Sequence, residues 1–193
     1  MPLNLFIIGP SGCGKSTQAK LVADKYHLTH LSMGQLLRDE IAATSPLGVK
    51  AKSFIDQGVW VPDDTVVDIL TAGLTAIDNQ NFIIDGFPRV LNQGKIIEYY
   101  LESAQKPFSL LIHLDVTFDE ILARRLRMGD NFQDKDRTDN TPQAIAKRQQ
   151  SYHDTIDPIM TYFSSVNKLF RVDGNRPVEP IFTDICQAID KIQ

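Results

Sequence analysis

The sequence predicts an α/β domain in three layers, with about five parallel strands between two layers of helices. Short continuous apolar runs, typical of buried strands, alternate along the chain with segments whose apolar residues recur at helical spacing. The 193 residues suit one globular domain. Ligands of such domains bind beyond the carboxyl ends of the strands, so the loops at that edge are where a site is expected.

Each expected element rests on a local pattern. The apolar runs place strands at 3–8, 29–32, 81–85, 109–116 and 169–172, of which the second is the most weakly signalled. Helical spacing places helices over 19–26, 66–77, 96–101 and 178–192, and another from 142 towards 158. Asp63 is the expected N-cap of the second helix, and Thr117 with Glu120 forms a capping-box pattern before a further one.

Two stretches interrupt this rhythm. Residues 33–62 have helical spacing without a strand of their own, and residues 129–140 are polar and rich in turn formers. The first is expected to be a helical insert and the second a mobile flap. We therefore divide the single domain of residues 1–193 into a core (1–31, 63–128 and 141–193), an insert (32–62) and a lid (129–140).

Composition and charge argue against several classes of protein. The net charge of −4 and the sequence pI near 5.5 do not suit a nucleic-acid surface, which is usually basic. No apolar run approaches the roughly 20 residues that cross a bilayer, and the N-terminus lacks a signal-peptide pattern. Cys13 and Cys186 are too few for a disulfide framework or a four-cysteine zinc site. We expect a cytoplasmic protein without nucleic-acid or membrane partners.

The segment between the first strand and the first helix carries the strongest motif. Its residues GPSGCGKS match G-x-x-x-x-G-K-[ST], with Gly9, Gly14, Lys15 and Ser16 at the defined positions. Glycines let backbone N–H groups approach an anion, and the N-terminus of the following helix adds a favourable dipole. Lys15 is expected to reach the β- and γ-phosphates of a nucleotide, and Ser16 to offer its hydroxyl to Mg²⁺. Cys13 is interpreted as a small filler of the loop rather than a redox group.

Other residues favour a kinase over a GTP-binding switch. The Asn167-Lys168 pair continues Leu-Phe and so lacks the N-K-x-D pattern with which such switches read their base. Guanidinium groups stabilise the charge on a transferring phosphoryl group, and an acceptor that is itself a phosphate needs no general base. The four histidines accordingly show no spacing that suggests a base or a metal site. The candidate arginines are Arg38, Arg89, Arg124, Arg125, Arg137 and Arg148.

The sequence resembles the adenylate kinases and the wider nucleoside monophosphate kinases over nearly its whole length. Four stretches carry the resemblance: GPSGCGKSTQ, LSMGQLLR, DGFPRVLNQ and RTDNTPQAIAKR. The resemblance implies a P-loop NTPase fold with a helical insert that binds the monophosphate and a short lid without zinc-binding cysteines. It also implies reversible phosphoryl transfer from Mg·ATP to AMP, giving two ADP. A monomer is the default expectation.

On the donor side the resemblance implies contacts with ATP and Mg²⁺. The ATP-binding residues would be Gly12, Cys13, Gly14, Lys15, Ser16, Thr17, Arg124, Arg125 and Arg176. Arg124 and Arg125 compete for the position over the adenine ring, and Arg176 lies in a loop similar to the one near that base. Mg²⁺ would be held by Ser16 and, through water, by Asp85 at the end of its strand.

On the acceptor side the implied AMP-binding residues are Met33, Arg38, Val59, Trp60, Val61, Gly86, Phe87, Pro88, Arg89, Gln93, Arg137 and Arg148. Gln93 falls where adenylate kinases place a glutamine on the adenine edge, and a side-chain amide can both donate and accept there. The implied catalytic residues are Lys15, Arg89, Arg137 and Arg148. Arg137 and Arg148 would bridge the transferring phosphoryl group.

Departures from the family pattern leave two alternatives open. Met33 replaces a threonine or alanine of the family, so UMP or CMP as the acceptor is the alternative within this enzyme class. Met128 stands where a second arginine often precedes the lid, and Asn140 replaces an aspartate. These two changes motivate the other alternative, a nucleotide-binding regulatory protein without catalysis.

Overall fold

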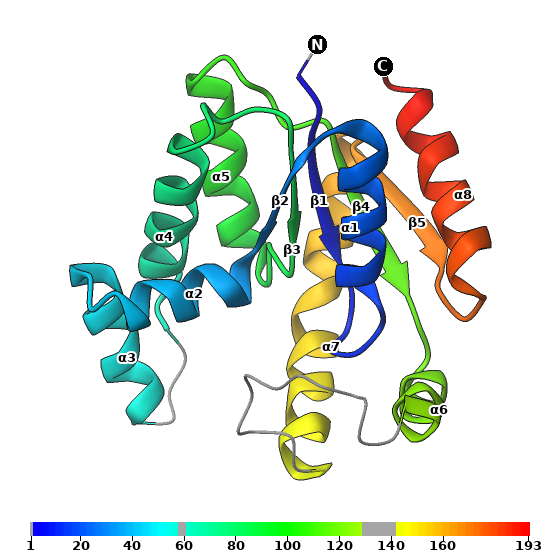
Figure 1. Ribbon diagram of the computed structural model, residues 1–193, viewed down its shortest axis with the longest axis horizontal. Coiled ribbons are helices and arrows are strands. Elements are labelled where there is room, and N and C mark those ends of the chain that lie inside the picture. Colours follow the sequence, from blue (N-terminus) through cyan, green and yellow to red (C-terminus); the bar gives the residue numbers. More distant parts are fainter. Residues whose placement is uncertain (1, 58–60, 129–141) are drawn as a thin grey trace.

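The computed structural model describes residues 2–57, 61–128 and 142–193, apart from the side chains of Arg125, Met128 and residues 142–147. Strands and helices alternate along these ranges, so the predicted three-layer α/β architecture is confirmed (Figure 1). The expected lid lies outside the described residues, as do residues 58–60 of the insert. No helix in the described ranges is both long and apolar enough to cross a membrane.

The described residues form one parallel sheet of five strands in the order β2-β3-β1-β4-β5. The strands are β1 (Asn4–Ile8), β2 (Thr29–Ser32), β3 (Phe82–Asp85), β4 (Leu110–Asp115) and β5 (Leu169–Asp173). All five predicted strands are thus confirmed, including the weakly signalled β2. Every residue of the central strand β1 is buried, which explains why its sequence from Leu5 to Ile8 is a continuous apolar run.

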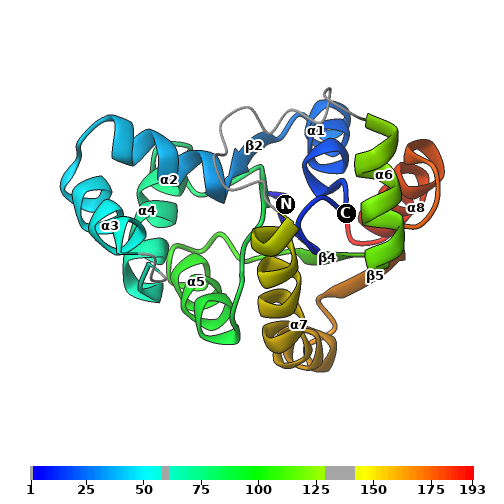
Figure 2. The ribbon, with the colours of Figure 1, turned by 90° about the horizontal axis from the view of Figure 1, so that it is seen from below.

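Helices cover both faces of the sheet (Figures 1 and 2). On one face α1 (Lys15–Tyr26) and α8 (Val178–Asp190) pack with α6 (Phe118–Met128), and on the other lie α4 (Asp63–Thr75), α5 (Leu91–Ser103) and α7 (Pro142–Ser165). Side chains alternate along β1. Leu5 and Ile7 therefore join the core on the side of α1 and α8, while Phe6 and Ile8 join the core on the side of α4, α5 and α7. The two cores thus pack against opposite faces of the sheet.

The insert is helical, as expected, where the structure describes it. It contains α2 (Met33–Ala42) and α3 (Pro46–Asp56), which extend from the sheet beside α4 (Figure 1). Gly48 on α3 packs directly on the backbone of Glu40 on α2, where a Cβ would collide with the Glu40 carbonyl. This close approach explains a glycine in mid-helix.

Several predicted helix boundaries need correction. Asp63 is the first residue of α4 rather than its N-cap, which is Pro62, because the Asp63 carboxylate instead accepts from the Gln93 amide. At α6 the Thr117 hydroxyl accepts from the Glu120 N–H, but the Glu120 carboxylate binds arginines and does not complete the capping box. Helix α7 continues past Pro158 to Ser165, and α8 ends at Asp190.

Candidate active site

Three loops meet where β1, β2 and β3 end, at the lower edge of the sheet in Figure 1. The parallel register sets Asp85, the last residue of β3, opposite Ile7 of β1 and Ser32 of β2. The glycine loop after β1, the DGFPR segment after β3 and the start of α2 therefore emerge side by side. This is the edge at which parallel α/β sheets bind their ligands.

The glycine loop has the geometry of an anion-binding site. Gly12 and Gly14 have φ values of 86° and 96°, a left-handed conformation that side chains rarely adopt. Helix α1 starts at Lys15 with Gly14 as its N-cap, and no side chain caps it. The first backbone N–H groups of α1 therefore remain directed out of its N-terminus, where a phosphate would be attracted.

The loop also sits close to the sheet. A Cβ at Gly9 would lie 2.7 Å from the Cys13 Sγ and 2.8 Å from the Leu114 carbonyl oxygen, so only glycine fits there. The Cys13 side chain is fully buried, and burial raises the pKa of its thiol. A buried neutral thiol is a poor nucleophile, and its role in the loop is to fill space.

Lys15 lies between the glycine loop and the DGFPR segment. Its Nζ donates to the Pro10 carbonyl at 3.3 Å, and its Cε would be 3.8 Å from a Cβ at Gly86. Gly86 in turn accepts at its carbonyl from the Arg89 Nε at 3.2 Å. Two motifs that are more than seventy residues apart in the sequence thus form one cationic cluster at the strand ends.

Asp85 provides the negative charge of this cluster. Its side chain is buried, and its Oδ2 lies 3.1 Å from the Nε2 of His30. Burial alone would raise the pKa of the Asp85 carboxyl, but the His30 hydrogen bond, the Lys15 ammonium and the Ser16 hydroxyl hold it below its ordinary value. A charged carboxylate is therefore maintained beside the glycine loop.

Arg124 on α6 is bound to protein oxygens on all sides of its guanidinium. Its Nη1 donates to the Cys13 carbonyl at 2.7 Å, its Nη2 to the carbonyls of Gly174 and Arg176, and its Nε to Glu120 at 2.9 Å. This arrangement connects the glycine loop to the loop between β5 and α8. The side chain of Arg125, its competitor for the position over the adenine ring, lies outside the described residues.

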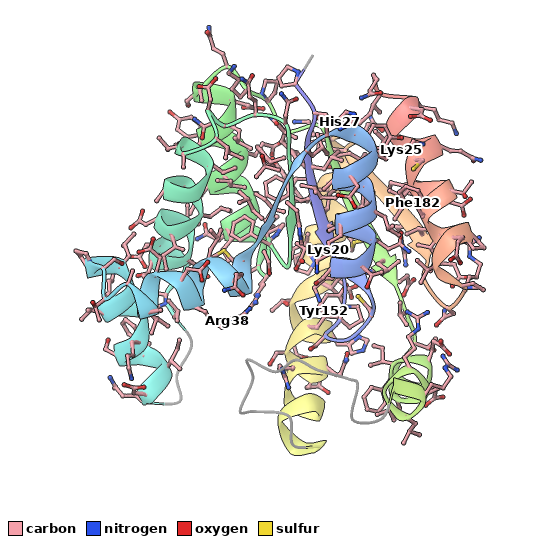
Figure 3. The ribbon with its side chains drawn as sticks, in the orientation of Figure 1. Lys20, Lys25, His27, Arg38, Tyr152 and Phe182 are labelled. Atoms are coloured by element: carbon pink, nitrogen blue, oxygen red, sulfur yellow. The ribbon has the colours of Figure 1, made fainter. Side chains whose placement is uncertain are left out.

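The residues expected to bind the acceptor lie on the insert and on the DGFPR segment. Figure 3 shows Arg38 on α2, on the side of the molecule where the strands end. Its Nη2 donates to Gln35 at 2.6 Å, while its buried Nε finds no acceptor among the described residues. Met33 is only 3% exposed and packs in the hydrophobic core. Val61 also packs against this core, whereas Val59 and Trp60 lie outside the described residues.

Gln93 is buried rather than exposed on its helix. Its Oε1 accepts from the Arg89 N–H at 2.9 Å, and its Nε2 donates to Asp63 at 2.7 Å. The amide thereby holds the start of α5 against the DGFPR segment, in which Phe87 and Pro88 are also buried. Gln93 and Arg89 therefore belong to one bonded unit.

The other arginines of the expected site come from other elements. Arg148 is half-buried on α7, and Arg176 pairs with Asp184 at 2.6 Å on the β5–α8 side. Arg137 lies outside the described residues. Ser16 and Thr17 are exposed on the first turn of α1, beside the glycine loop.

Sequence patterns did not identify two residues at this edge. His30 binds Asp85 although the histidines showed no informative spacing, and Gln149 of α7 donates to the Ser11 carbonyl at 3.1 Å. Partners that are 55 and 138 positions apart leave no local signal. For His30, the one available hint is its place in a strand that ends near the phosphate loop.

The fold and this cluster together define a P-loop phosphotransferase that acts on nucleotides. The family model of adenylate kinase matches residues 7–168 of the chain. The chain belongs to the adenylate kinase family. It is a nucleoside monophosphate kinase, and its reaction is the reversible transfer of a phosphoryl group from ATP to AMP.

Curated relatives agree with this assignment over the full length of the chain. The chain is 35% identical over 191 residues to the adenylate kinase of Bacteroides thetaiotaomicron, covering 98% of this chain and 100% of the relative. It is 37% identical over 196 residues to that of Trichodesmium erythraeum, with 98% and 99% covered. It is 36% identical over 190 residues to that of Xanthomonas campestris pv. campestris, with 98% and 100% covered.

Proposed function

We propose that the cluster at the strand ends is the site of this phosphoryl transfer, with the donor phosphates in the glycine loop. The backbone N–H groups of Gly12, Gly14 and the first turn of α1 would bind the phosphates. Lys15 would contact the β- and γ-phosphates. The left-handed glycines and the open N-terminus of α1 support this assignment.

The acceptor AMP is proposed to bind between the insert and the DGFPR segment. Arg38 and Arg89 would bind its phosphate, because guanidinium groups form forked hydrogen bonds with phosphate oxygens. Gln93 would face the adenine. Because its amide is already bonded to Arg89 and Asp63, adenine recognition requires it to exchange one of these partners or share it. Arg137 and Arg148 are proposed to bridge the transferring group.

Mg²⁺ is proposed to arrive with ATP. Asp85 would hold it through water and Ser16 through its hydroxyl, and when bound it would neutralise charge on the phosphates. The charged carboxyl of Asp85 fits such a role. The described residues contain no cluster of three or more histidine, cysteine or acidic side chains for a metal ion. An ion that takes most of its ligands from phosphate and water suits this set of donors.

The division into core, insert and lid belongs to the same proposal. Closure of the insert and of residues 129–140 over the bound nucleotides would exclude water and so prevent hydrolysis of ATP. We also propose that the protein works as a monomer in the cytoplasm, where its nucleotide substrates occur. The two cysteines, which are buried and unpaired, are compatible with a reducing compartment.

One observation carries the proposal: Lys15 of the donor loop lies against Gly86 of the acceptor segment. Nucleotides bound at these two motifs would bring their phosphates together around a shared lysine. Transfer between them then depends on positioning and on cationic stabilisation.

A panel of acceptors tests the proposal. ADP formation from ATP is measured with AMP, UMP, CMP and GMP, and with a Lys15→Ala variant as the control for contaminating kinases. We expect turnover with AMP that is lost in the variant. Rapid turnover of UMP without AMP would overturn the choice of base. Tight binding of a dinucleoside pentaphosphate without any turnover would instead indicate a protein that binds nucleotides but does not catalyse.

The burial of Met33 bears on the pyrimidine alternative. That alternative arose because a long thioether could reshape the acceptor pocket, but the side chain is almost entirely enclosed in the hydrophobic core. A buried side chain offers little surface to a nucleotide base. AMP therefore stands as the acceptor, in agreement with the family.

A further inference from the structure

Two side chains from different helices bind main-chain oxygens of the phosphate loop. Arg124 of α6 donates from Nη1 to the Cys13 carbonyl at 2.7 Å, and Gln149 of α7 donates from Nε2 to the Ser11 carbonyl at 3.1 Å. Gln149 is 6% exposed, and the Arg124 side chain is 20% exposed. Neither contact depends on which side chain the loop carries at positions 11 and 13.

These contacts determine where the loop directs its N–H groups. In a trans peptide the C=O and the N–H point in opposite directions. Because Arg124 binds the Cys13 carbonyl, the N–H of Gly14 points away from Arg124, and Gln149 orients the N–H of Gly12 in the same way. The two glycines are also those with left-handed φ values. The two contacts thus orient alternate peptides, as in an anion-binding nest.

Arg124 is itself firmly held. Its Nε donates to Glu120 at 2.9 Å, and Glu120 also accepts from Arg127 at 2.7 Å. Its Nη2 reaches the carbonyls of Gly174 and Arg176, in a loop that Asn175 ties to Thr117 at 3.0 Å. A guanidinium with four such bonds is a rigid support for the glycine loop.

A loop that contains three glycines has many conformations when it is unsupported. Ordering a residue costs conformational entropy, and a ligand that has to order the loop loses this free energy from its affinity. A support that orders the loop in advance removes the cost. The resulting gain in affinity is therefore expected for the ligand of the loop and not for the ligand of the insert.

We propose that Arg124 and Gln149 are positioning residues that hold the phosphate loop ready for the donor nucleotide. This inference rests on the proposed function in one respect, namely that the phosphates of ATP occupy the loop. Arg124 acts through the Cys13 peptide and Gln149 through the Ser11 peptide. For Arg124 this support is distinct from any contact of its guanidinium with the adenine, and a phosphate ligand without a base separates the two.

The test uses Arg124→Gln, Arg124→Lys and Gln149→Leu, with Arg127→Gln as the matched control. Arg127 is an arginine of the same helix that binds the same carboxylate, but its side chain is 63% exposed and bonds to Glu120. Arg124→Lys keeps the positive charge and loses the fork that spans Cys13, Gly174 and Glu120. It therefore separates support of the loop from simple attraction of phosphate.

We expect Arg124→Gln, Arg124→Lys and Gln149→Leu to raise KM for ATP roughly tenfold, the size of one lost hydrogen bond to a charged or buried group. KM for AMP stays as in the wild type, and Arg127→Gln changes neither constant. Binding of inorganic tripolyphosphate, followed by calorimetry, weakens by the same factor because the contact is made by phosphates. A variant that is merely less stable would lose active enzyme and leave KM unchanged.

Wild-type KM for ATP in folded Arg124→Gln and Gln149→Leu would overturn the inference, as would equal rises in both KM values. If Arg124→Lys behaves as the wild type while Arg124→Gln is impaired, charge alone acts and the support by Arg124 is refuted. Thermal unfolding identifies variants that do not fold, and Gln149→Leu then carries the test. Absence of ATP and AMP turnover in the wild type, or full turnover in Lys15→Ala, would indicate failure of the proposed function instead.

Discussion

His30 and Asp85 form a buried pair at the ends of the neighbouring strands β2 and β3, with Nε2 and Oδ2 3.1 Å apart. The Asp85 side chain is 5% exposed and that of His30 is 20% exposed. The histidine holds the carboxylate in place, and the Lys15 ammonium and the Ser16 hydroxyl also stabilise its charge.

Replacement of His30 by leucine is expected to reduce stability more than catalysis. The buried carboxylate would lose a hydrogen bond to a ring N–H, a loss of about 1–3 kcal/mol in the free energy of unfolding. Lys15 and Ser16 still stabilise its charge, so kcat falls far less than in an Asp85 variant. Urea unfolding measures the effect, and His30→Gln, which keeps a donor, is the control. Equal stability of the leucine and glutamine variants would contradict the structural role.

Replacement of Asp85 by asparagine is expected to impair the use of Mg²⁺. A carboxylate that acts on a metal through water contributes about 10–100-fold to affinity or activity. The variant should need more Mg²⁺ for half-maximal rate. Asp115→Asn is the matched control, because Asp115 ends β4 but is exposed and pairs with Arg171 at 3.1 Å. An unchanged Mg²⁺ titration in the Asp85 variant would remove this residue from the metal site.

Replacement of Arg89 by alanine is expected to lower kcat/KM strongly. Its Nε donates to the Gly86 carbonyl at 3.2 Å, beside Lys15, so its guanidinium lies near the proposed bridge of phosphates. Loss of a donor to the transition state costs about 3–4 kcal/mol. Steady-state kinetics measure the loss, and Arg171→Ala, an exposed arginine on β5, is the control. The assignment fails if both variants retain wild-type kcat/KM.

The stability of the protein is expected to fall in mild acid because of His113. This residue is buried on β4 with its Nε2 2.6 Å from the Tyr152 hydroxyl (Tyr152 is labelled in Figure 3), and burial lowers the pKa of the ring from 6.5 to about 4. Between these values the unfolded chain binds a proton that the folded chain does not. The contribution is therefore complete above pH 6.5 and is lost as the pH falls towards 4.

The size of this effect is roughly 3 kcal/mol. Urea unfolding between about pH 4 and 7 measures it as the difference between the wild type and His113→Gln, which keeps a polar partner for Tyr152. His153→Gln, at an exposed position of α7, is the control and should follow the wild type. Parallel pH profiles for the wild type and His113→Gln would show that this histidine has no part in acid sensitivity.

The strands and the phosphate loop could be predicted from the sequence because their signals are local. A buried parallel strand is a continuous apolar run, and the glycine loop has a defined spacing. The neighbours of each strand are set by packing between distant segments. The sequence therefore does not indicate the contact of His30 with Asp85 or that of Gln149 with the loop.

Local rules failed where a distant partner competed for the same group. Asp63 has the sequence context of an N-cap, yet its carboxylate binds Gln93 thirty positions away. Glu120 could have completed a capping box, but Arg124 and Arg127 bind its carboxylate. For Glu120, two ionised arginines form stronger contacts than the backbone N–H of a helix end, and for Asp63 the side-chain amide of Gln93 takes the place of that N–H.

The attachment of Arg124 and Gln149 to carbonyl groups has a consequence for how such loops change during evolution. Every residue type has a carbonyl, so substitutions at positions 11 and 13 leave the attachment intact as long as the new side chain fits the loop. Selection for a well-ordered loop therefore acts on two distant helices. The sequence of the loop motif gives no sign of this selection. Enzymes with identical glycine motifs can thus differ in how strongly they bind ATP.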